Sequence, residues 1–292
     1  MQSIGDDMSE QKLWVALPDT VLSDNKNLRD KTIKLGAIAR SCAIFRVNKI
    51  FFYRDHTTTL GEFELIRIIL EYLDTPQYLR RQLYGMKKEL QYAGLLPPLR
   101  TPHHKLVEKN SEIKVGGFRE GIVVKNSGQH YVDVGLSNLI PVEGPVSKGS
   151  RVTVKFTSQY PNLRCQVTER DNVKEYWGYE VKEATSLKKL LKSLNVDISI
   201  LTSRKGIPLT NLWEKLVTEI QHARTILVVF GSPRSGVKEI LAKDNVNPKD
   251  LSKYVLNILQ EQGSATIRTE EALLGTLAIL NFAKIMNSQV AF

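Results

Sequence analysis

The sequence is poor in cysteine and in long apolar runs, and both absences narrow the class of protein. Among its 292 residues only Cys42 and Cys165 are cysteines, and they stand far apart. Two isolated thiols form neither a disulfide framework nor a thiolate zinc site, so we interpret both as inert structural cysteines. The longest apolar runs, such as ILVVFG at 226–231, are far shorter than the roughly 18–20 residues of a membrane-spanning helix. We therefore expect no transmembrane segment.

The chain also lacks an acidic surplus and a recognisable secretory signal. Its 41 Lys and Arg exceed its 31 Asp and Glu, which gives a formal net charge of +10. This surplus favours a polyanionic partner, with nucleic acid first and an anionic membrane surface second. The opening residues, MQSIGDDMSEQK, are polar and acidic, so we expect a cytoplasmic protein. With 42% hydrophobic and 25% charged residues, the chain has the balance of a folded protein of one or two domains.

The N-terminal third has an α/β pattern. Short apolar runs at 13–17 and 49–53 predict strands, and the stretch 26–45 between them predicts an amphipathic helix. We expect Arg29, Lys31 and Lys34 of this helix to face water. The order strand, helix, strand indicates a parallel pair.

Two further helices and a proline-rich linker follow. Residues 62–74 continue as helix, and Pro76 can open a second helix that runs to about Tyr92. The stretch QYAGLLPPLRTPHH at 91–104 then holds three prolines, which neither a helix nor a central strand accommodates. We interpret it as a linker or hinge.

The hydrophobic period changes from helical to two after Lys105. Alternating runs, joined by turns such as NSG and VEGP, predict a small closed β-barrel of OB type. We expect the strands at 119–125, 129–134, 151–156 and 163–168.

The α/β pattern returns at about Tyr176. We expect helices at 185–194, 208–223 and 266–287, and strands at 197–202, 225–230 and 254–259. The chain thus predicts an α/β domain built from 1–104 and 176–292, interrupted by an OB-like barrel at 105–175.

The first candidate site is VVFGSPRSG at 228–236. A buried strand enters a glycine-rich turn and then a helix, which is how α/β sheets present ligands at the carboxyl ends of their strands. A nucleotide-triphosphatase P-loop has a similar glycine spacing, but its second glycine is followed at once by Lys and then Ser or Thr. Here Gly236 is followed by Val237, Lys238 and Glu239. The P-loop therefore remains a disfavoured alternative, as does a loop that only turns the chain.

The second candidate site is LNILQEQGSATIRTEEA at 256–272, a strand followed by a loop and a helix start. Glu270 and Glu271 lie in the first helical turn, where the helix dipole favours acids, so a well-capped helix is one interpretation. Arg268 lies in the same turn, where the dipole is unfavourable to a cation. It is better placed to meet an anionic ligand.

These segments together resemble the SPOUT superfamily of S-adenosylmethionine-dependent RNA methyltransferases, in its archaeal and eukaryotic branch with an inserted OB-like domain. The resemblance covers nearly the whole chain and rests on four stretches. It implies a deep trefoil knot near the C-terminus, S-adenosylmethionine bound in the knot loops, and a homodimer paired through the knotted region. The stretches are LWVALPDTVLSD at 13–24, QYAGLLPPLRTPHH at 91–104, LVVFGSPRSG at 227–236 and NILQEQGSATIRTEEALLGTLAILN at 257–281.

The resemblance also assigns a cofactor pocket, residue by residue. An apolar slot for adenine with polar groups for the ribose and amino-acid ends suits S-adenosylmethionine. The sequence departs from the family pattern at Gln260 and Glu261, which puts the shape of that loop in question. The implied pocket residues are Phe230, Gly231, Ser232, Gly236, Asn257, Ile258, Leu259, Gln262, Gly263, Ser264 and Thr266, with Thr202 and Ser203 as a weaker addition.

Methyl transfer needs alignment of the sulfonium methyl with a nucleophile and requires no metal. For a uridine ring nitrogen, as the resemblance to rRNA-modifying relatives implies, the proton must be lost and the oxyanion stabilised. We expect Arg268 to supply that cation. Glu271 or Glu270 can orient Arg268 or accept a proton, and Arg234 can hold a phosphate. A ribose hydroxyl is the alternative target.

RNA binding is expected from the segment between Pro76 and Lys105, which holds six basic residues and one acid. Cations for phosphates and the interleaved Tyr78, Tyr84 and Tyr92 for stacking are typical of RNA recognition, whereas a solvated helix face with core tyrosines is the alternative. His103 and His104 lack further ligands for a metal, so we expect a packing or RNA-contact role. The basic residues are Arg80, Arg81, Lys87, Lys88, Arg100 and Lys105.

The sequence therefore predicts an S-adenosylmethionine-dependent methyltransferase that acts on RNA, with ribosomal RNA as the favoured substrate. The alternative is a non-catalytic RNA-binding or assembly protein that keeps the fold, for which Gln260 and Glu261 are the only hint.

Overall fold

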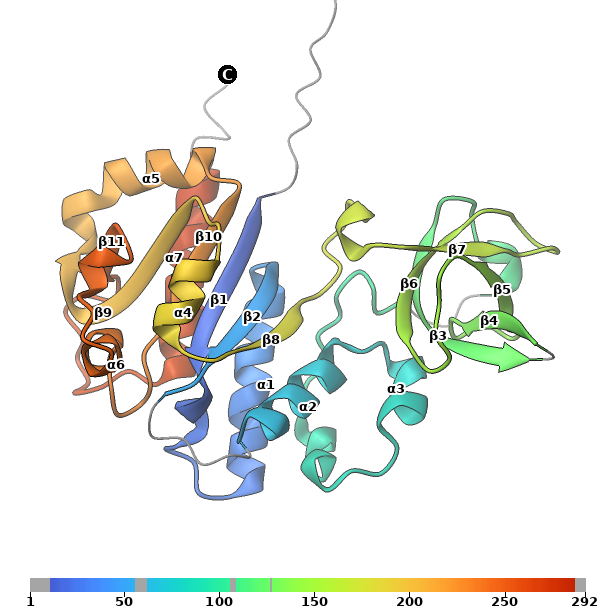
Figure 1. The fold of residues 1–292 in the computed structure, drawn as a ribbon, viewed down its shortest axis with the longest axis horizontal. Helices are drawn as coiled ribbons and strands as arrows, with labels where there is room; N and C mark the ends of the chain where they lie inside the picture. The colour runs from blue at the N-terminus through green and yellow to red at the C-terminus, as the bar shows by residue number, and fades with distance from the viewer. Residues whose placement is uncertain (1–10, 56–61, 106–108, 127, 287–292) are drawn as a thin grey trace, which may run out of the picture. The chain divides into compact units, whose positions relative to one another are not determined.

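The computed structural model describes residues 11–55, 62–105, 109–126 and 128–286, and the chain packs as two compact units (Figure 1). The first unit contains the residues up to Leu70, Tyr92–Leu96 and the residues from Tyr179 onward. The second contains Glu71–Gln91 and Pro97–Gly178. The N-terminal residues 1–10 and the expected helix end at Asn287 lie outside the described residues.

The first unit is built on a six-stranded sheet in which all pairs of neighbouring strands are parallel. Its strands are β1 (Lys12–Pro18), β2 (Val47–Tyr53), β8 (Glu180–Ala184), β9 (Ile198–Pro208), β10 (Thr225–Val229) and β11 (Tyr254–Asn257). Their order is β11-β9-β10-β1-β2-β8, which confirms the predicted parallel α/β sheet. In the sheet, β2 and β8 lie on one side of β1, and β10, β9 and β11 lie on its other side, so the strand order reverses at β1. Ligands of such sheets bind beyond the carboxyl ends of the strands near this reversal.

Helices cover both faces of the sheet, because successive side chains of a strand point to opposite faces. The helices of this unit are α1 (Leu28–Ile44), most of α2 (Glu62–Asp74), α4 (Leu187–Ser193), α5 (Trp213–His222), α6 (Val237–Lys243) and α7 (Thr269–Ile285). Leu187 of α4 and Ile240 of α6 pack with Phe51 and Leu227 on one face. α7 contacts α1 and α5. In Figure 1, α4 lies in front of the sheet and α7 behind it.

Three elements of the first unit differ from the sequence prediction. β8 was not predicted, because its sequence EVKEA carries three charges, as short edge strands often do. β9 runs to Pro208 rather than Thr202, because its polar second half pairs with β11. The expected helix at 208–223 becomes α helix only from Trp213, after a 3-10 turn at Leu209–Leu212.

The second unit contains a closed five-stranded barrel. Its strands are β3 (Phe118–Asn126), β4 (Gln129–Asp133), β5 (Ile140–Glu143), β6 (Arg151–Phe156) and β7 (Cys165–Thr168). The order is β3-β4-β5-β7-β6, with β6 returning to β3 and only β5–β7 parallel, an arrangement consistent with the OB type. Val132, Val154 and Phe156 fill its core. The sequence prediction missed β5, a four-residue strand of sequence IPVE with little alternation.

Helix α3 (Gln77–Tyr84) also belongs to the second unit and is shorter than predicted. It follows Pro76 as expected, but it ends at Gly85, whose φ is +53°, instead of continuing to Tyr92. Isolated 3-10 turns follow because the left-handed residue breaks the α-helical hydrogen-bond ladder. Within the described residues, the 3-10 turns are Asp19–Leu22, Lys88–Leu90, Ala93–Leu95, Asn110–Glu112, Arg170–Asn172, Leu209–Leu212 and Pro248–Asp250.

Both cysteines are free and buried, which fits their interpretation as structural thiols. Burial raises the pKa of Cys165 to about 12 and that of Cys42 further, so both stay protonated at neutral pH. None of the helices within the described ranges combines the length and the apolarity needed to span a bilayer.

Candidate functional site

A cavity of about 410 Å³ opens at the carboxyl ends of β9, β10 and β11. Most of the predicted cofactor residues line it, although they come from three separate parts of the sequence. Gly263 and Ser264 do not line the cavity and are exposed. The predicted residues that line it are Thr202, Ser203, Phe230, Gly231, Ser232, Arg234, Gly236, Asn257, Ile258, Leu259, Gln262 and Thr266.

The loop after β10 is held in a tight, internally bonded turn. The backbone N–H of Ser232 donates to the Ser235 carbonyl at 2.8 Å, and the N–H of Ser235 donates to Oγ of Ser232 at 2.9 Å. A Cβ on Gly231 would lie 2.8 Å from the Gly236 Cα, so the turn closes only because glycine stands there. The two glycines of this motif therefore shape one wall of the cavity.

Tyr53, at the end of β2 and two strands away from β10 in the sheet, anchors the start of this loop. Its hydroxyl donates to the Phe230 carbonyl at 2.6 Å, and the whole side chain is buried. Burial raises the pKa of Tyr53 well above its ordinary value, and the carboxylates of Asp55 and Asp19 raise it further. The hydroxyl therefore stays protonated and acts as a permanent donor to the loop.

The loop after β11 forms the opposite wall. Nε2 of Gln262 donates to the Leu259 carbonyl at 2.9 Å, and the Thr210 hydroxyl lies 3.3 Å from Oε1 of Gln260. Glu261 adopts a φ of +49°. Gln260 and Glu261, which depart from the family pattern, thus lie in a loop that is held by the polar contacts of Gln260 and Gln262. Ile258 and Leu259, just before them, line the cavity.

Three charged residues that the sequence analysis did not single out also line the cavity. Arg204 and Lys205 lie in the second half of β9, and Glu239 lies in α6. Nη1 of Arg204 donates to the Ala265 carbonyl at 2.7 Å, which ties β9 to the loop after β11. Lys205 lies 3.6 Å from Glu239. The only sequence signal was their position just after the predicted strand at 197–202.

The residues predicted for chemistry surround the start of α7. Arg268 precedes this helix, and its exposed side chain lies next to Ile267 and Thr269, which do line the cavity. Oε2 of Glu271 accepts the backbone N–H of Arg268 at 2.9 Å, so this carboxylate caps the helix. Arg234 lines the cavity from the other loop and is exposed.

Glu270 is paired with a buried cation, and this finding corrects one expectation. Nζ of Lys34 lies 2.7 and 2.8 Å from the two carboxylate oxygens of Asp24 and 3.3 Å from Oε2 of Glu270. Only 3% of Lys34 is exposed, so the prediction that it faces water is wrong. It is buried because α1 packs against α7 along this face. Glu270 therefore serves the contact between two helices.

Four of the six basic residues predicted to contact RNA are exposed, and two, Arg80 and Lys105, are half-buried. Arg80 donates from Nε to the Thr75 carbonyl at 2.8 Å and lies over the ring of Tyr72, so its side chain holds the end of α2. Tyr78 and Tyr84 are engaged within the second unit, and burial raises the pKa of Tyr78 to about 12. These tyrosines fit the packing alternative. Arg81, Lys87, Lys88 and Arg100 are exposed, and Lys105 is half-buried.

His103 and His104 take a packing role. Their Nε2 atoms lie 2.7 and 3.0 Å from the Asp74 carbonyl, and the two rings meet edge to face. Within the described ranges, no group of three or more His, Cys, Asp and Glu side chains is arranged to hold a metal ion.

Comparison with known proteins relates this architecture to RNA-modifying enzymes. A profile of the family described as "Putative RNA methyltransferase" matches residues 12–280. The chain is 33% identical over 308 residues to a 28S rRNA (uridine-N(3))-methyltransferase of Drosophila melanogaster, in an alignment that covers 92% of this chain and 61% of the fly protein. The chain therefore spans less than two thirds of that relative.

Two further relatives match the same share of the chain. A 28S rRNA (uridine-N(3))-methyltransferase of Homo sapiens is 33% identical over 302 residues, which cover 92% of this chain and 77% of the human protein. An uncharacterized protein of Haloarcula marismortui is 32% identical over 287 residues, which cover 92% of this chain and 99% of the archaeal protein. The similarity thus extends over both units.

Proposed function

The chain belongs to this family of RNA methyltransferases, and we propose that it transfers a methyl group from S-adenosylmethionine to a uridine ring nitrogen of ribosomal RNA. The observation that carries the proposal is the cavity of about 410 Å³ at the carboxyl edge of the sheet, where the loops after β10 and β11 converge with β9 and the start of α7. A cavity of this size and position is typical of a cofactor site in an α/β protein.

The chemistry of the cavity suits S-adenosylmethionine. Leu256, Ile258 and Leu259 supply apolar surface for an adenine ring, and the backbone of the loop after β11 offers donors and acceptors for its edge. The hydroxyls of Thr202 and Ser203 and the amide of Gln262 are polar groups for the ribose and amino-acid ends. When bound, the cofactor supplies an electrophilic methyl group.

The residues around the cavity then have to position the uridine and stabilise charge. Loss of the N3 proton leaves negative charge on the uracil ring, which a nearby cation stabilises. We propose Arg268 for this role, because its side chain is exposed and its sequence neighbours Ile267 and Thr269 line the cavity. The contact with Glu271 uses the backbone N–H of Arg268 and not its guanidinium. Arg234, on the opposite loop, is proposed to hold a phosphate of the RNA.

The acids near this site have structural partners. Glu271 caps α7, and Glu270 pairs with buried Lys34. We therefore propose that Glu271 acts on the reaction only by orienting Arg268 through the helix cap. The ring nitrogen, rather than a ribose hydroxyl, is proposed as the target because the fly and human relatives carry that position in their names.

We further propose a homodimer that pairs through α7. Leu274, Phe282 and Ile285 are 45%, 56% and 48% exposed on this otherwise core-forming helix, and the Phe282 ring stacks on Trp213 of α5. Exposed apolar clusters of this kind mark protein contacts. The resemblance to the SPOUT superfamily supports the same pairing, together with a trefoil knot in the chain that forms the cavity. Light scattering of the Phe282→Lys variant is expected to report a monomer where the wild type is a dimer.

The proposed function is tested by titration of S-adenosylmethionine with a matched pair of variants. Ala272 lines the cavity from α7, so Ala272→Phe is expected to fill it and abolish binding. Ala242 is exposed on α6, and Ala242→Phe is expected to bind as the wild type does. ATP with magnesium is the control ligand, for which no binding is expected.

The reaction itself is read from the product. Incubation of the protein with S-adenosylmethionine and 28S rRNA, followed by nucleoside mass spectrometry, is expected to yield N3-methyluridine from the wild type and none from Ala272→Phe. A wild type that binds RNA but neither binds the cofactor nor forms the product would support the non-catalytic alternative instead.

A further inference from the structure

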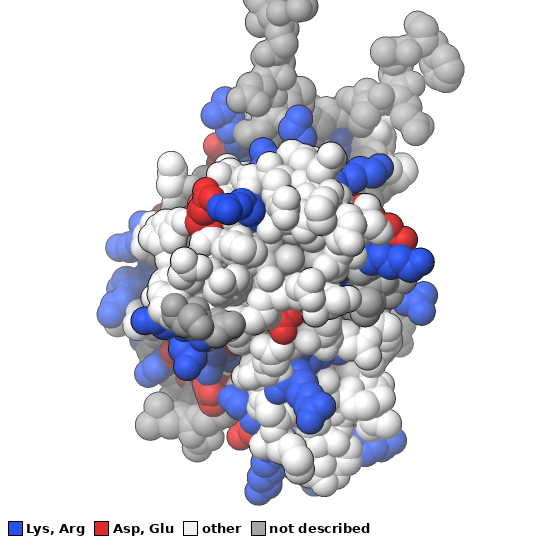
Figure 2. Space-filling view, turned by 90° about the vertical axis from the view of Figure 1, so that its right-hand side faces the viewer, with Lys and Arg blue, Asp and Glu red and all other residues white. Residues whose placement is uncertain are grey.

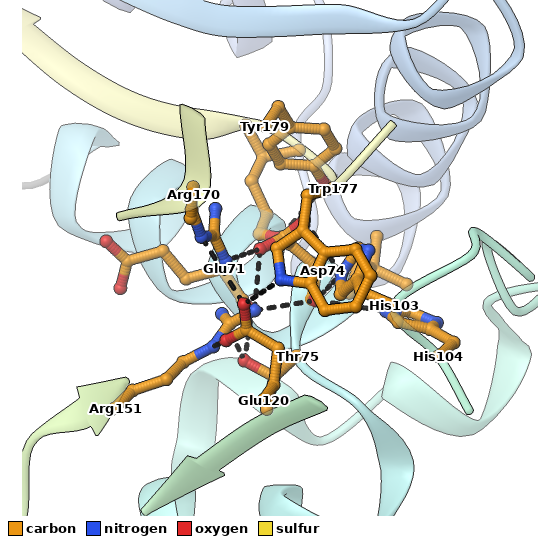
Figure 3. A network of polar contacts seen from close by, with 12 residues as sticks. Glu71, Asp74, Thr75, His103, His104, Glu120, Arg151, Arg170, Trp177 and Tyr179 are labelled. Atoms are coloured by element: carbon orange, nitrogen blue, oxygen red, sulfur yellow. Dashed lines mark hydrogen bonds and ion pairs between the residues drawn. The ribbon is translucent and has the colours of Figure 1, made fainter. Parts of the chain in front are cut away.

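The second unit contains a buried cluster of charges that the proposed reaction does not use (Figure 3). Asp74, at the end of α2, and Glu120, in β3, are 2% and 1% exposed. Arg151 of β6 lies between them: Nη2 is 3.0 Å from Oδ2 of Asp74, and Nε is 2.7 Å from Oε2 of Glu120. Arg170 adds contacts of 3.1 Å to Asp74 and 3.5 Å to Glu120. Two carboxylates and two guanidiniums therefore balance each other.

Neutral donors complete the coordination of both acids. The Thr153 hydroxyl and the Trp177 indole N–H donate to Oε1 of Glu120 at 2.8 and 2.7 Å. His103 lies 3.3 Å from Oδ1 of Asp74, and Figure 3 shows both histidines directed at this end of α2. The cluster thus joins four segments that are distant in sequence: the end of α2, the proline-rich linker, the barrel wall and the residues around 170–177.

The charges keep both acids ionised. Burial alone would raise the pKa of each carboxyl, but Arg170 and Arg151 hold the pKa of Asp74 well below its ordinary value. The pKa of Glu120 is also lowered, by Arg151 and Arg170 against the effect of burial. A buried ion cluster of this kind is weak evidence for net stability, but removal of one member is strongly unfavourable, so the cluster enforces one geometry.

That geometry determines where α3 lies. The chain passes from Asp74 directly into α3, and the Thr75 hydroxyl accepts from Nη1 of Arg151 at 3.1 Å. The Tyr78 hydroxyl donates to the Glu120 carbonyl at 2.8 Å. The Tyr78 ring also lies so close to the backbone that a Cβ on Gly135 would be 2.5 Å from it. One face of α3 is therefore packed directly on the barrel.

Exposed basic residues lie in the same segment, within α3 and just after it. Arg81 of α3 and Lys87 and Lys88 beyond its end are exposed, whereas Tyr78 and Tyr84 are partly buried by contacts within the unit. Figure 2, which views the molecule from the side on which Figure 1 draws the barrel, shows more Lys and Arg than Asp and Glu among its exposed side chains. Exposed cations of this kind suit contacts with the phosphates of RNA.

We propose that α3 and the basic residues that follow it form, together with the barrel, one rigid RNA-backbone-binding surface, and that Asp74 is the positioning residue that holds α3 in place for it. This inference rests on the proposed action on RNA and extends it, because it names the surface and the mode of contact. Recognition through phosphates is independent of base sequence, so the surface fits the backbone of a folded RNA. In this proposal, selection of the RNA sequence comes from the residues around the cavity and not from this surface.

The surface is tested by two matched charge reversals. Lys87→Glu/Lys88→Glu changes the exposed basic segment, and Lys189→Glu/Lys192→Glu changes two exposed lysines of α4 in the first unit. Both variants alter the net charge equally, so a non-specific electrostatic effect would be the same in both. The probe is a fluorescein-labelled RNA hairpin, titrated at several salt concentrations by anisotropy.

The first variant is expected to bind the hairpin at least tenfold more weakly and to lower the slope of log K against log salt by about two, because each of the two lysines no longer neutralises a phosphate. The second is expected to stay within twofold of the wild type. The weakening should be the same for hairpins with different loop sequences. Equal weakening in the two variants, or weakening confined to one loop sequence, would overturn the proposed surface.

The role of Asp74 is tested by Asp74→Asn, which keeps the shape of the side chain and removes its charge. We expect faster amide hydrogen exchange in α3, at least a fivefold loss of hairpin affinity, and unchanged affinity for S-adenosylmethionine. The double variant Asp74→Asn/Arg170→Gln removes one charge of each sign and is expected to recover part of both α3 protection and affinity. Hairpin affinity equal to that of the wild type, with α3 released, would refute the positioning role.

The outcomes separate this inference from the proposed function. If Asp74→Asn does not fold, the two charge reversals still decide whether the surface binds RNA. A wild type that binds S-adenosylmethionine but no hairpin at 0.1 M salt would overturn the surface and leave the methyltransferase site standing. Hairpin binding without cofactor binding would overturn the methyltransferase function and leave the surface standing.

Discussion

The buried Lys34 offers the sharpest test of how the start of α7 is held. Its ammonium group lies against the carboxylates of Asp24 and Glu270, and its side chain is 2% exposed. Lys34→Met keeps the length of the side chain and removes the charge, so both carboxylates lose their partner. The expected result is a less stable first unit, because a buried charge without a partner is costly to retain in the fold.

The magnitude follows from the exposure of the two acids. Breaking a buried ion pair costs about 3–5 kcal/mol. Asp24 is 33% exposed and can be solvated in part, whereas Glu270 is 16% exposed, so we expect the lower end, about 3 kcal/mol. For a unit of this size that corresponds to a fall in Tm of about 6–12 °C.

The assay is chemical and thermal denaturation, followed by circular dichroism, of the wild type and four variants: Lys34→Met, Glu270→Gln, Lys34→Met/Glu270→Gln and Arg29→Met. Arg29→Met, on the same helix but 60% exposed, is the control and is expected to change stability by less than about 0.5 kcal/mol. Lys34→Met/Glu270→Gln removes the less exposed of the two stranded charges, so its loss of stability should be about 1–3 kcal/mol smaller than the sum of the two single-variant losses. A Lys34→Met protein within about 0.5 kcal/mol of the wild type would refute the reasoning.

Three further predictions concern other contacts. Tyr53→Phe leaves the Phe230 carbonyl without its 2.6 Å donor, which should cost about 1–3 kcal/mol in stability and weaken S-adenosylmethionine binding in a calorimetric titration. Gly135→Ala places a methyl group against the Tyr78 ring at a φ of +75°, so amide hydrogen exchange in α3 should become faster. Burial lowers the pKa of His104 to about 4, so the folded protein favours the neutral ring. The stability that this preference contributes is present above the ordinary pKa of 6.5 and is lost as the pH falls toward 4. In His104→Asn, the free energy of unfolding should therefore depend less on pH in this range.

Each of these predictions has an outcome that contradicts it. Unchanged cofactor affinity in Tyr53→Phe would show that the loop after β10 needs no anchor from β2. Wild-type exchange rates in Gly135→Ala would show that Tyr78 can move without releasing α3. A His104→Asn protein with the same pH dependence as the wild type would assign that dependence to other groups, of which Asp74 and Glu120 act at lower pH because their folded pKa values are depressed.

Much of the architecture was predictable because its signals are local. Alternating and continuous apolar runs marked most of the strands, and the helical spacing in 62–74 matched α2. The strands that were missed, β5 and β8, are short and carry little apolar alternation, so the sheet or barrel around them determines their conformation. α3 ended early because Gly85 adopts a positive φ that hydrophobic periodicity does not reveal.

The candidate site divides in the same way. The glycine-rich loops after β10 and β11 were visible as motifs, since each lies next to a strand in the sequence and turns at the same edge of the sheet. Arg204 and Lys205 were missed because they continue a strand whose pairing with β11 has no local signature. Lys34 was assigned to the solvent because helical spacing describes one helix at a time and contains no information about α7.

By itself the sequence determined the alternation of apolar and polar residues, and with it the parallel sheet, the barrel and the positions of the two loops that end at the cavity. Only the tertiary structure decided which charges are buried together. Lys34 meets Glu270, and Asp74 meets Arg151 and Arg170, across long separations in the chain. Hydrophobic burial follows from local patterning, whereas an ion pair depends on the distance between two groups, and that distance exists only once the chain has folded.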